Sequence, residues 1–330
     1  MDVIHGWQAS TRNKIIEDDE DPYGKHPRRA ENLFSDCKMK YAPFFGCMIT
    51  VKYPQMEAAV RKTARNLGME LVDLEGFSCC PDPIFFKATD KLTWLTIAAR
   101  NICIAEEAGL DMVTMCSGCT ATLSEANFHL STEPELKEKV NQRLKRIGRE
   151  YKGTISVRHI VTVLRDDLGI DRVRESVKRP LGGIKVGIHY GCHLLKPSEI
   201  MRVDDPDYPT ILEKLFSAIG AEIVHHEKQA LCCGKACMSE NIPEKMTYDV
   251  LTSLKKSGAN LMGLICPTCF DEFDLGQIKL SRKYNQDLTI PILYYFQLLG
   301  LAQGLSPQEV GLHLHKTKTD QIVEKLAGSN

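Results

Sequence analysis

The chain has 330 residues, which is enough for about two domains of the usual ~150 residues. Hydrophobic residues make up 43% of the chain and charged residues 26%, as in a folded protein that buries a substantial core. The 42 basic residues nearly balance the 43 acidic ones, so the net charge of −1 exerts no long-range attraction on polyanions. We therefore expect no nucleic-acid partner.

The chain start lacks the apolar segment of a secretory signal, and no later apolar run reaches the ~20 residues that cross a bilayer. We expect a cytoplasmic protein with no direct membrane span. Thirteen cysteines are many for such a chain, and a reducing compartment disfavours structural disulfides. The cysteines are therefore expected to bind metal or to act in redox chemistry.

Residues 1–38 are polar and aperiodic, and we interpret them as an N-terminal extension. Strands are then expected near residues 41–45, 70–73 and 112–115. The apolar segment WLTIAARNICIAEEAG predicts a helix, and its Cys103 is expected to pack as a small hydrophobic residue. The charged stretch 136–153 is also expected to be helical.

The sequence KRPLGG at residues 178–183 interrupts the pattern, because proline and paired glycines end regular structure. We therefore expect a first domain at 39–180 and a second at 181–330. Strands are expected in the second near residues 185–190, 222–225 and 261–265. Short apolar runs between helical segments predict an α/β fold, with a small parallel sheet flanked by helices in each half.

Ten of the thirteen cysteines fall into two copies of one pattern. The first copy reads C-x31-CC-x35-C-x2-C, and the second reads C-x39-CC-x32-C-x2-C. The first set is Cys47, Cys79, Cys80, Cys116 and Cys119, and the second set is Cys192, Cys232, Cys233, Cys266 and Cys269. Flanking sequences repeat as well, since FFGC at the start of the first set matches HYGC at the start of the second. This pattern indicates an internal duplication.

Every cysteine group follows the carboxyl end of an expected strand. Open α/β sheets build their sites at this edge, so cysteines that are far apart in sequence are expected to converge there. Gly46 and Gly191 directly precede a cysteine, and we expect them to allow close backbone approach at the site.

Two kinds of metal site compete for these cysteines. Zinc takes four thiolates, but adjacent residues such as Cys79 and Cys80 diverge and do not chelate one tetrahedral ion well. Five cysteines per set also exceed the four that zinc or a cubane cluster requires. We favour an iron-sulfur cluster in each half and keep zinc as the alternative. Cys37 is interpreted as incidental, and a ligand role for Cys237 stays open.

The duplicated pattern resembles the CCG-domain proteins, and within them the HdrB-like subunits of heterodisulfide reductase. The resemblance extends from about residue 39 to 326. It is carried by stretches that include GMELVDLEGFSCCPDP, VGIHYGCHLLKPSEI, CPTCFDEFDLGQ and PILYYFQLLGLAQGLSPQEVGL. Several of these lie outside the cysteines, which makes the similarity more specific than the ligand pattern alone.

The resemblance implies an enzyme of methanogenesis with two non-cubane 4Fe-4S clusters, one held by each cysteine set. The mixed disulfide of coenzyme M and coenzyme B would be reduced to two thiols between the clusters. Electrons would arrive from an iron-sulfur partner, the C subunit, and from a flavin partner, the A subunit, of the same complex. Hydrogenase or formate dehydrogenase are possible further partners.

Two residues beside the second set are candidates for a catalytic role. His193 follows Cys192 and can donate a proton to a departing thiolate, or it can simply hold the loop. Lys235 follows the second cysteine pair in CCGKACMSE, where family members have small residues. This departure leaves the identity of the disulfide open. Lys196 is interpreted as either an anion contact or a solvent-facing side chain.

Three alternatives remain at this point. The chain can be a CCG-type electron-transfer subunit of another oxidoreductase, a reductase of a different disulfide, or a zinc-stabilised scaffold. Electron-transfer members commonly carry ferredoxin-type C-x2-C-x2-C-x3-C runs, which this sequence lacks. That difference favours catalysis.

Overall fold

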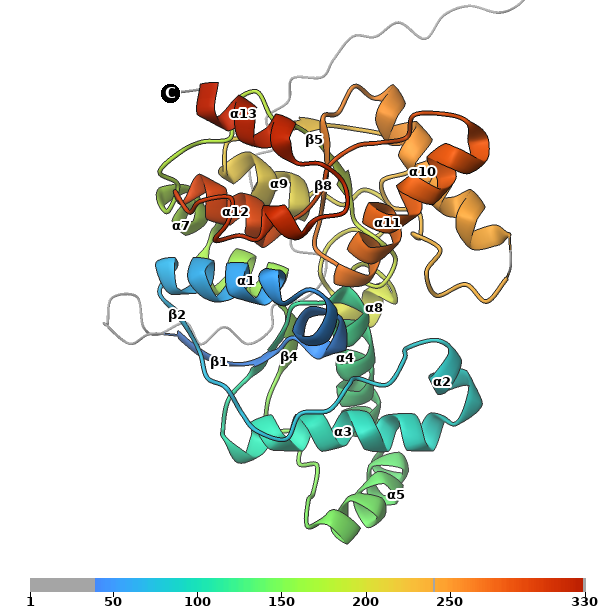
Figure 1. Cartoon of the computed structure of the whole chain (residues 1–330). Helices are drawn as coiled ribbons and strands as arrows, with labels where there is room; N and C mark the ends of the chain where they lie inside the picture. Colours follow the sequence, from blue (N-terminus) through green and yellow to red (C-terminus); the bar gives the residue numbers. More distant parts are fainter. Residues whose placement is uncertain (1–38, 240, 329–330) are drawn as a thin grey trace, which may run out of the picture. The chain divides into compact units, whose positions relative to one another are not determined.

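Two four-stranded sheets, each with all strands parallel, form the framework of the chain (Figure 1). The structure is a computed structural model that describes residues 39–239 and 241–328. The strand orders are β2-β1-β3-β4 and β6-β5-β7-β8, so the second sheet repeats the first. The predicted α/β class with two similar halves is confirmed. The expected extension at 1–38, with Cys37, lies outside the described residues.

The first sheet contains β1 (Met39–Phe44), β2 (Met69–Leu71), β3 (Met112–Thr114) and β4 (Val157–His159). Its connections contain the π-helical turn η1 (Met48–Lys52), α1 (Pro54–Asn66), α2 (Phe85–Thr89), α3 (Lys91–Glu107), α4 (Ser117–Thr132), α5 (Pro134–Leu144) and α6 (Ile160–Val163). The helix α7 (Ile170–Glu175) leads toward the second sheet.

The second sheet contains β5 (Lys185–His189), β6 (Glu222–Val224), β7 (Leu261–Leu264) and β8 (Ile292–Tyr294). Its helices are α8 (Ser198–Met201), α9 (Ile211–Ala218), α10 (Ile242–Lys256), α11 (Pro267–Tyr284), α12 (Tyr295–Ala302) and α13 (Asp320–Gly328). All six strands expected from the sequence are present, and each ends slightly earlier than expected.

Two further strands, β4 and β8, were not expected. Each has three residues and runs directly into a helix, α6 or α12. A short apolar run that continues as a helix has no alternation of its own, so the sequence pattern does not distinguish the strand from the helix that follows it. These strands complete the sheets, and their last residues, His159 and Tyr294, cap the helices that follow.

Three strands of each sheet end at the same level, whereas the edge strands β2 and β6 end two or three residues earlier, since Leu71 pairs with Tyr41 and Val224 with Gly187. Phe44 pairs with Thr114, and Thr114 pairs with His159 across the first sheet. In the second sheet Leu264 pairs with both His189 and Tyr294. Because parallel strands leave the sheet in the same direction, the connections that follow them start from one common edge.

Burial follows the position of each strand in its sheet. The inner strands β3 and β7 and the outer strand β8 are wholly buried, as expected for parallel sheets covered on both faces. The edge strands β2 and β6 are partly exposed. The helix predicted around Cys103 is α3, and this cysteine is fully buried as expected. The charged stretch 136–153 forms most of α5 and a short 3-10 turn.

Helix α1 of the first half lies alongside α12 of the second (Figure 1). The amide of Asn66 donates to Gln303 Oε1 at 2.9 Å at this contact, and Lys62 pairs with Glu309 at 3.1 Å. The predicted boundary near residue 180 stays a prediction. Within the described ranges, no helix has both the length and the apolarity that a bilayer span requires.

Replacing Phe216 by alanine should lower the free energy of unfolding by about 3–5 kcal/mol, because it empties a packed core position. The ring of Phe216 is 0% exposed and meets Tyr295 edge to face at 5.1 Å between centroids. Tyr208→Ala is the control, since Tyr208 is 82% exposed and its loss should change stability by less than about 0.5 kcal/mol. Urea unfolding of both variants measures the difference, and equal effects would contradict this description of the core.

Candidate cysteine-rich functional site

The ten repeated cysteines lie at the carboxyl edge of the two sheets, as predicted. Cys116 and Cys266 follow β3 and β7 and are the N-caps of α4 and α11. Cys47 and Cys192 follow β1 and β5, and the adjacent cysteine pairs lie in the connections after β2 and β6. Partial positive charge at a helix N-terminus favours a thiolate at such a cap, and of these two cysteines only Cys266 has a lowered pKa, whereas the pKa of Cys116 is raised.

The five cysteines of the first set form a continuous series of sulfur contacts. Cys79 Sγ lies 3.4 Å from Cys47 Sγ, and Cys80 Sγ lies 3.0 Å from Cys119 Sγ. Side-chain hydrogen bonds also join Cys79 to Cys80 and Cys119 to Cys116. The structure therefore brings the whole first set together.

The second set repeats this series in the same order. Cys192 Sγ lies 3.6 Å from Cys232 Sγ, and side-chain hydrogen bonds continue from Cys232 to Cys233, then to Cys269 and Cys266. In the described part of the chain, no three His, Cys, Asp or Glu side chains converge closely enough to hold a single metal ion. The thiols lie in two rows of successive contacts.

The two sets meet at one point. The side chains of Cys116 and Cys266, one from each set, are hydrogen-bonded to each other and are only 4% and 6% exposed. Beside this contact the hydroxyl of Tyr294 donates to the backbone oxygen of Met115 at 2.6 Å. A residue of the second half thus fixes the strand end that precedes Cys116 in the first half.

Two glycines let the backbone approach the sulfurs, as predicted. A Cβ atom on Gly46 would lie 2.5 Å from Cys119 Sγ, and one on Gly191 would lie 3.2 Å from Cys269 Sγ. Both glycines have positive φ angles, of 69° and 73°, which side chains rarely adopt. No other residue type fits at either position without displacing a cysteine.

Hydrogen bonding among the sulfurs favours a thiolate in each adjacent cysteine pair. Hydrogen bonds from Cys119 and Cys79 lower the pKa of Cys80 to about 5. Hydrogen bonds from Cys192 and Cys233 lower the pKa of Cys232 to about 2. Thiolates are the form that binds metal, so one sulfur of each pair is prepared for ligation, while the pKa values of the neighbouring Cys79 and Cys233 are raised by their hydrogen bonds to Cys80 and Cys232.

Several buried polar atoms at this edge have no hydrogen-bond partner among the described residues. They are Ser117 Oγ, His159 Nε2, both ring nitrogens of His189, and His193 Nε2. A buried donor without an acceptor is costly, so such atoms indicate a group that is bound there in the working protein. Thiolate and sulfide sulfurs are acceptors that suit these N–H and O–H donors. The residues present therefore fit a sulfur-rich metal group.

His159 is the clearest example of a buried donor that has no acceptor. Burial lowers its pKa to about 3, so the ring is neutral, and Nδ1 accepts the backbone N–H of Val161 at 3.2 Å. The proton must then reside on Nε2, where it has no acceptor. The thiolate of Cys266 is the charged group that acts on this ring. Sequence reasoning missed His159 because the strand β4 that carries it was not expected.

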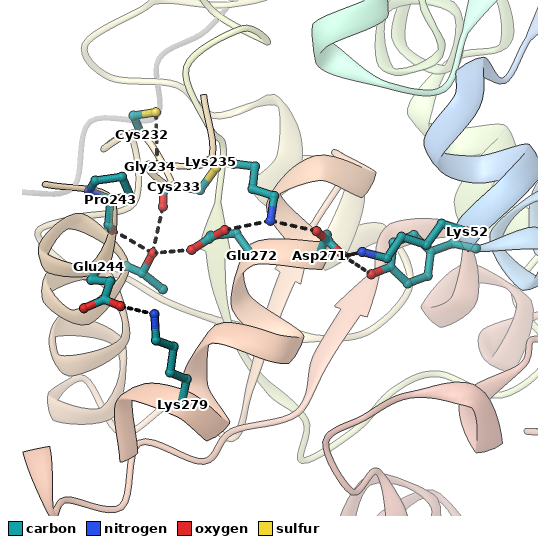
Figure 2. Close-up of polar contacts among 12 residues, drawn as sticks. Lys52, Cys232, Cys233, Gly234, Lys235, Pro243, Glu244, Asp271, Glu272 and Lys279 are labelled. Carbon is teal, nitrogen blue, oxygen red and sulfur yellow. Dashed lines mark hydrogen bonds and ion pairs between the residues drawn. The ribbon is translucent and has the colours of Figure 1, made fainter. Parts of the chain in front are cut away.

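The two candidate catalytic residues have different surroundings. His193 directly follows Cys192 and keeps Nε2 buried without a partner. A cavity of about 260 Å³ beside Cys192 is lined by Gly191, Cys192, Leu195, Lys196, Pro206, Asp207, Ala230, Leu231 and Cys232, and His193 is not among its lining residues. Lys235 does not line this cavity. Its ammonium pairs with Asp271 at 3.0 Å and with Glu272 at 3.3 Å (Figure 2).

Asp271 is a site residue that the sequence reasoning did not single out. Its carboxylate accepts hydrogen bonds from Lys52, Tyr53 and Lys235. Burial alone would raise the pKa of Asp271, but these bonds hold that pKa below its ordinary value. Asp271 is the second residue after Cys269, which is the only signal in the sequence that could have drawn attention to it.

Cys103 and Cys237, the other two cysteines among the described residues, take no part in the two series of sulfur contacts. Burial raises the pKa of Cys103 to about 12, in keeping with a packing role in α3. The backbone N–H of Cys237 donates to Gly234 O at 2.8 Å and closes a turn after the second cysteine pair. A ligand role for Cys237 stays open.

Comparison with known proteins adds to this geometry. The cysteine-rich domain family, CCG, matches twice, at residues 41–124 and 186–274. The B subunit of a ferredoxin/F(420)H(2)-dependent CoB-CoM heterodisulfide reductase from Methanosarcina acetivorans is 38% identical over 291 residues. This alignment covers 87% of the present chain and 97% of that protein. The chain therefore belongs to the CCG family and, within it, groups by sequence with the B subunits of heterodisulfide reductase.

Two further similarities define how far this relationship extends. The membrane anchor subunit of an 8-methylmenaquinol:fumarate reductase from Wolinella succinogenes is 31% identical over 276 residues, covering 83% of this chain and 95% of that one. The crystal structure of a hypothetical protein from Helicobacter pylori matches with a TM-score of 0.69 at 17% identity. It covers 85% of this chain and 52% of that chain, and it supports the fold alone.

Gly46→Ala should destabilise the metal-free chain more than the same change at an unconstrained glycine. Gly148 is the matched control, because its φ is 70° and a Cβ there meets nothing within 4 Å. Gly148→Ala should cost about 1–2 kcal/mol through backbone strain alone. Gly46→Ala adds the contact with Cys119 Sγ, for a further ~1–3 kcal/mol. Urea unfolding in reductant measures both, and equal losses would show that the sulfur contact does not constrain Gly46.

Proposed function

We propose that this chain is the disulfide-reducing component of a CoB-CoM heterodisulfide reductase complex. One observation carries the proposal. Two equivalent rows of five cysteines meet at Cys116 and Cys266, so two redox sites would lie next to each other. Sequence similarity to the B subunit of such a complex supports the same function.

Each cysteine set is proposed to hold one non-cubane 4Fe-4S cluster. A cluster with several irons offers separate coordination points, which suits a row of five contacting thiols and an adjacent pair. The low pKa values of Cys80 and Cys232 supply thiolates for ligation. Unpartnered donors such as His159 Nε2 can hydrogen-bond to cluster or thiolate sulfur.

Reduction of a disulfide to two thiols consumes two electrons and two protons. Two iron-sulfur clusters, when bound, would supply the electrons one at a time. His193 is the proposed donor of one proton, because its Nε2 is buried without another partner, and solvent water supplies the second proton. The cavity beside Cys192 and Cys232 is proposed to admit the substrate. Lys196 on its wall can bind an anionic group of the substrate.

The electrons are proposed to come from partner subunits in the cytoplasm. The C subunit with further iron-sulfur clusters and the A subunit with flavin are the proposed donors, linked onward to hydrogenase or formate dehydrogenase. This assignment rests on the similarity to a component of heterodisulfide reductase, since the chain's near-zero net charge does not itself favour a particular partner.

A second candidate function is electron transfer without disulfide chemistry. The 31% identity with a component of 8-methylmenaquinol:fumarate reductase favours it, because the name of that relative includes no disulfide substrate. The metal sites would be the same, so metal analysis does not separate the two functions. Turnover with a disulfide separates the two functions, because only the first of them includes it.

Anaerobically prepared chain should contain about eight iron atoms and acid-labile sulfide, corresponding to two 4Fe-4S clusters. Cys80→Ala should remove the iron of the first set and leave about four iron atoms in the second. Cys103→Ala is the control, because Cys103 is buried in α3 away from both sets and its loss should leave the iron content unchanged. Near-zero iron with stoichiometric zinc would end this assignment.

The purified complex should reduce the mixed coenzyme disulfide with a low-potential dye as electron donor. His193→Gln should lower kcat by about 100-fold or more, since it removes the proposed proton donor. His225→Gln is the matched control, because His225 is exposed and faces Glu213 at 3.5 Å on the second sheet. Fully metal-loaded complex without turnover would reject this substrate, and unchanged kcat in His193→Gln would reject the proton donor.

A further inference from the structure

Three residues near the cysteines form a charged contact that the duplication does not repeat. Asp271 accepts from Lys52 of the first half and from Lys235 of the second half (Figure 2). The corresponding position for Asp271 in the first half is Ala121, counted from the C-x2-C motif. In the same way Lys235 corresponds to Asp82, and Lys52 corresponds to Pro197. The duplication therefore supplies no second, equivalent contact of this kind.

Asp271 is held as a buried anion. Its side chain is only 2% exposed, and the hydroxyl of Tyr53 also donates to it. A carboxylate this deeply buried is stable only when donors surround it, and removing one partner leaves the others mismatched. Since Lys52 and Tyr53 come from the first half, Asp271 joins the two halves by charge-assisted bonds.

Short, regular segments connect this contact to cysteines of the first set. Lys52 is the last residue of η1, which begins directly after Cys47. The turn is closed by the backbone N–H of Tyr53, which donates to Met48 O at 2.9 Å. The hydroxyl of Thr50 donates to Gly46 O at 3.0 Å. Movement of Lys52 relative to Asp271 would therefore move Cys47 as well.

Equally short connections lead to the second set. Asp271 lies in the first turns of α11, two residues after Cys269. Lys235 lies two residues after Cys233, whose carbonyl accepts the hydroxyl of Thr247 at 2.9 Å. Thr247 also contacts Glu272 Oε1 at 3.1 Å, so the loop with the second cysteine pair is tied to α10 and α11.

We infer that Asp271 is a positioning residue that holds Cys47 of the first set at a fixed distance from Cys233 and Cys269 of the second set. Its importance for catalysis rests on the proposed function, because two sites that each deliver one electron to the same disulfide must keep a constant separation. The contact is distinct from metal ligation, since no thiol takes part in it.

Distance measurement between two spin labels tests this inference on the full-length chain. The labels are attached through a ketone-bearing amino acid at positions 51 and 282, which leaves the cysteines unmodified. Val51 is 81% exposed beside Lys52, and Arg282 is an exposed residue near the end of α11. Pulsed electron–electron double resonance then reports how η1 and α11 are held relative to each other.

Asp271→Asn should broaden the label distance distribution and lengthen its mean, while iron per chain stays unchanged. Asp249→Asn is the matched control, because Asp249 pairs with Lys245 within the surface of α10 and should leave the distribution as in the parent. If Asp271→Asn fails to fold, Lys52→Met and Tyr53→Phe take its place as test variants. Each removes one donor to Asp271 and should broaden the label distance distribution relative to the parent.

Distributions as narrow as the parent in all folded variants of Asp271, Lys52 and Tyr53 would overturn the inference. Loss of iron in Lys52→Met would also overturn it, because the contact would then belong to metal binding. The label distances need no substrate, so absence of disulfide turnover in the parent would reject the proposed function and leave this test intact.

Discussion

The level ends of parallel strands are the constraint on which the site depends. In both sheets the third strand ends in register with the first and fourth, and each then passes into a loop or helix cap that carries chemistry. Ten cysteines separated by as much as 222 residues of sequence therefore reach one edge. Helix caps and glycines then determine which sulfurs touch. The series of contacts is the same in both halves because the strand order is the same.

The two halves match closely in their cysteines and differ in the residues around them. Both sets need a glycine before the first cysteine, and both have one in the left-handed conformation. The buried carboxylate of Asp271 occurs only in the second half, where it faces two lysines. Two cysteine sets with the same series of contacts thus have different electrostatic surroundings.

Much of this arrangement could be predicted from the sequence, and the reasons for success and failure are physical. Six strands and both cysteine sets were predicted because apolar runs and repeated spacing are local patterns. The strands β4 and β8 were missed because three residues that run into a helix carry no separate signal. The contact between Cys116 and Cys266 and that between Lys52 and Asp271 depend on packing between the halves. Such packing leaves no trace in local spacing.

Each half completes the site of the other through the ends of the fourth strands. The charge of Cys266 in the second half acts on the ring of His159 in the first half, and the hydroxyl of Tyr294 in the second half donates to the strand end before Cys116 of the first. A chain with a single motif would lack one of these supports unless a second copy provided it. Separating the two halves of this chain would therefore remove a support from each cysteine set.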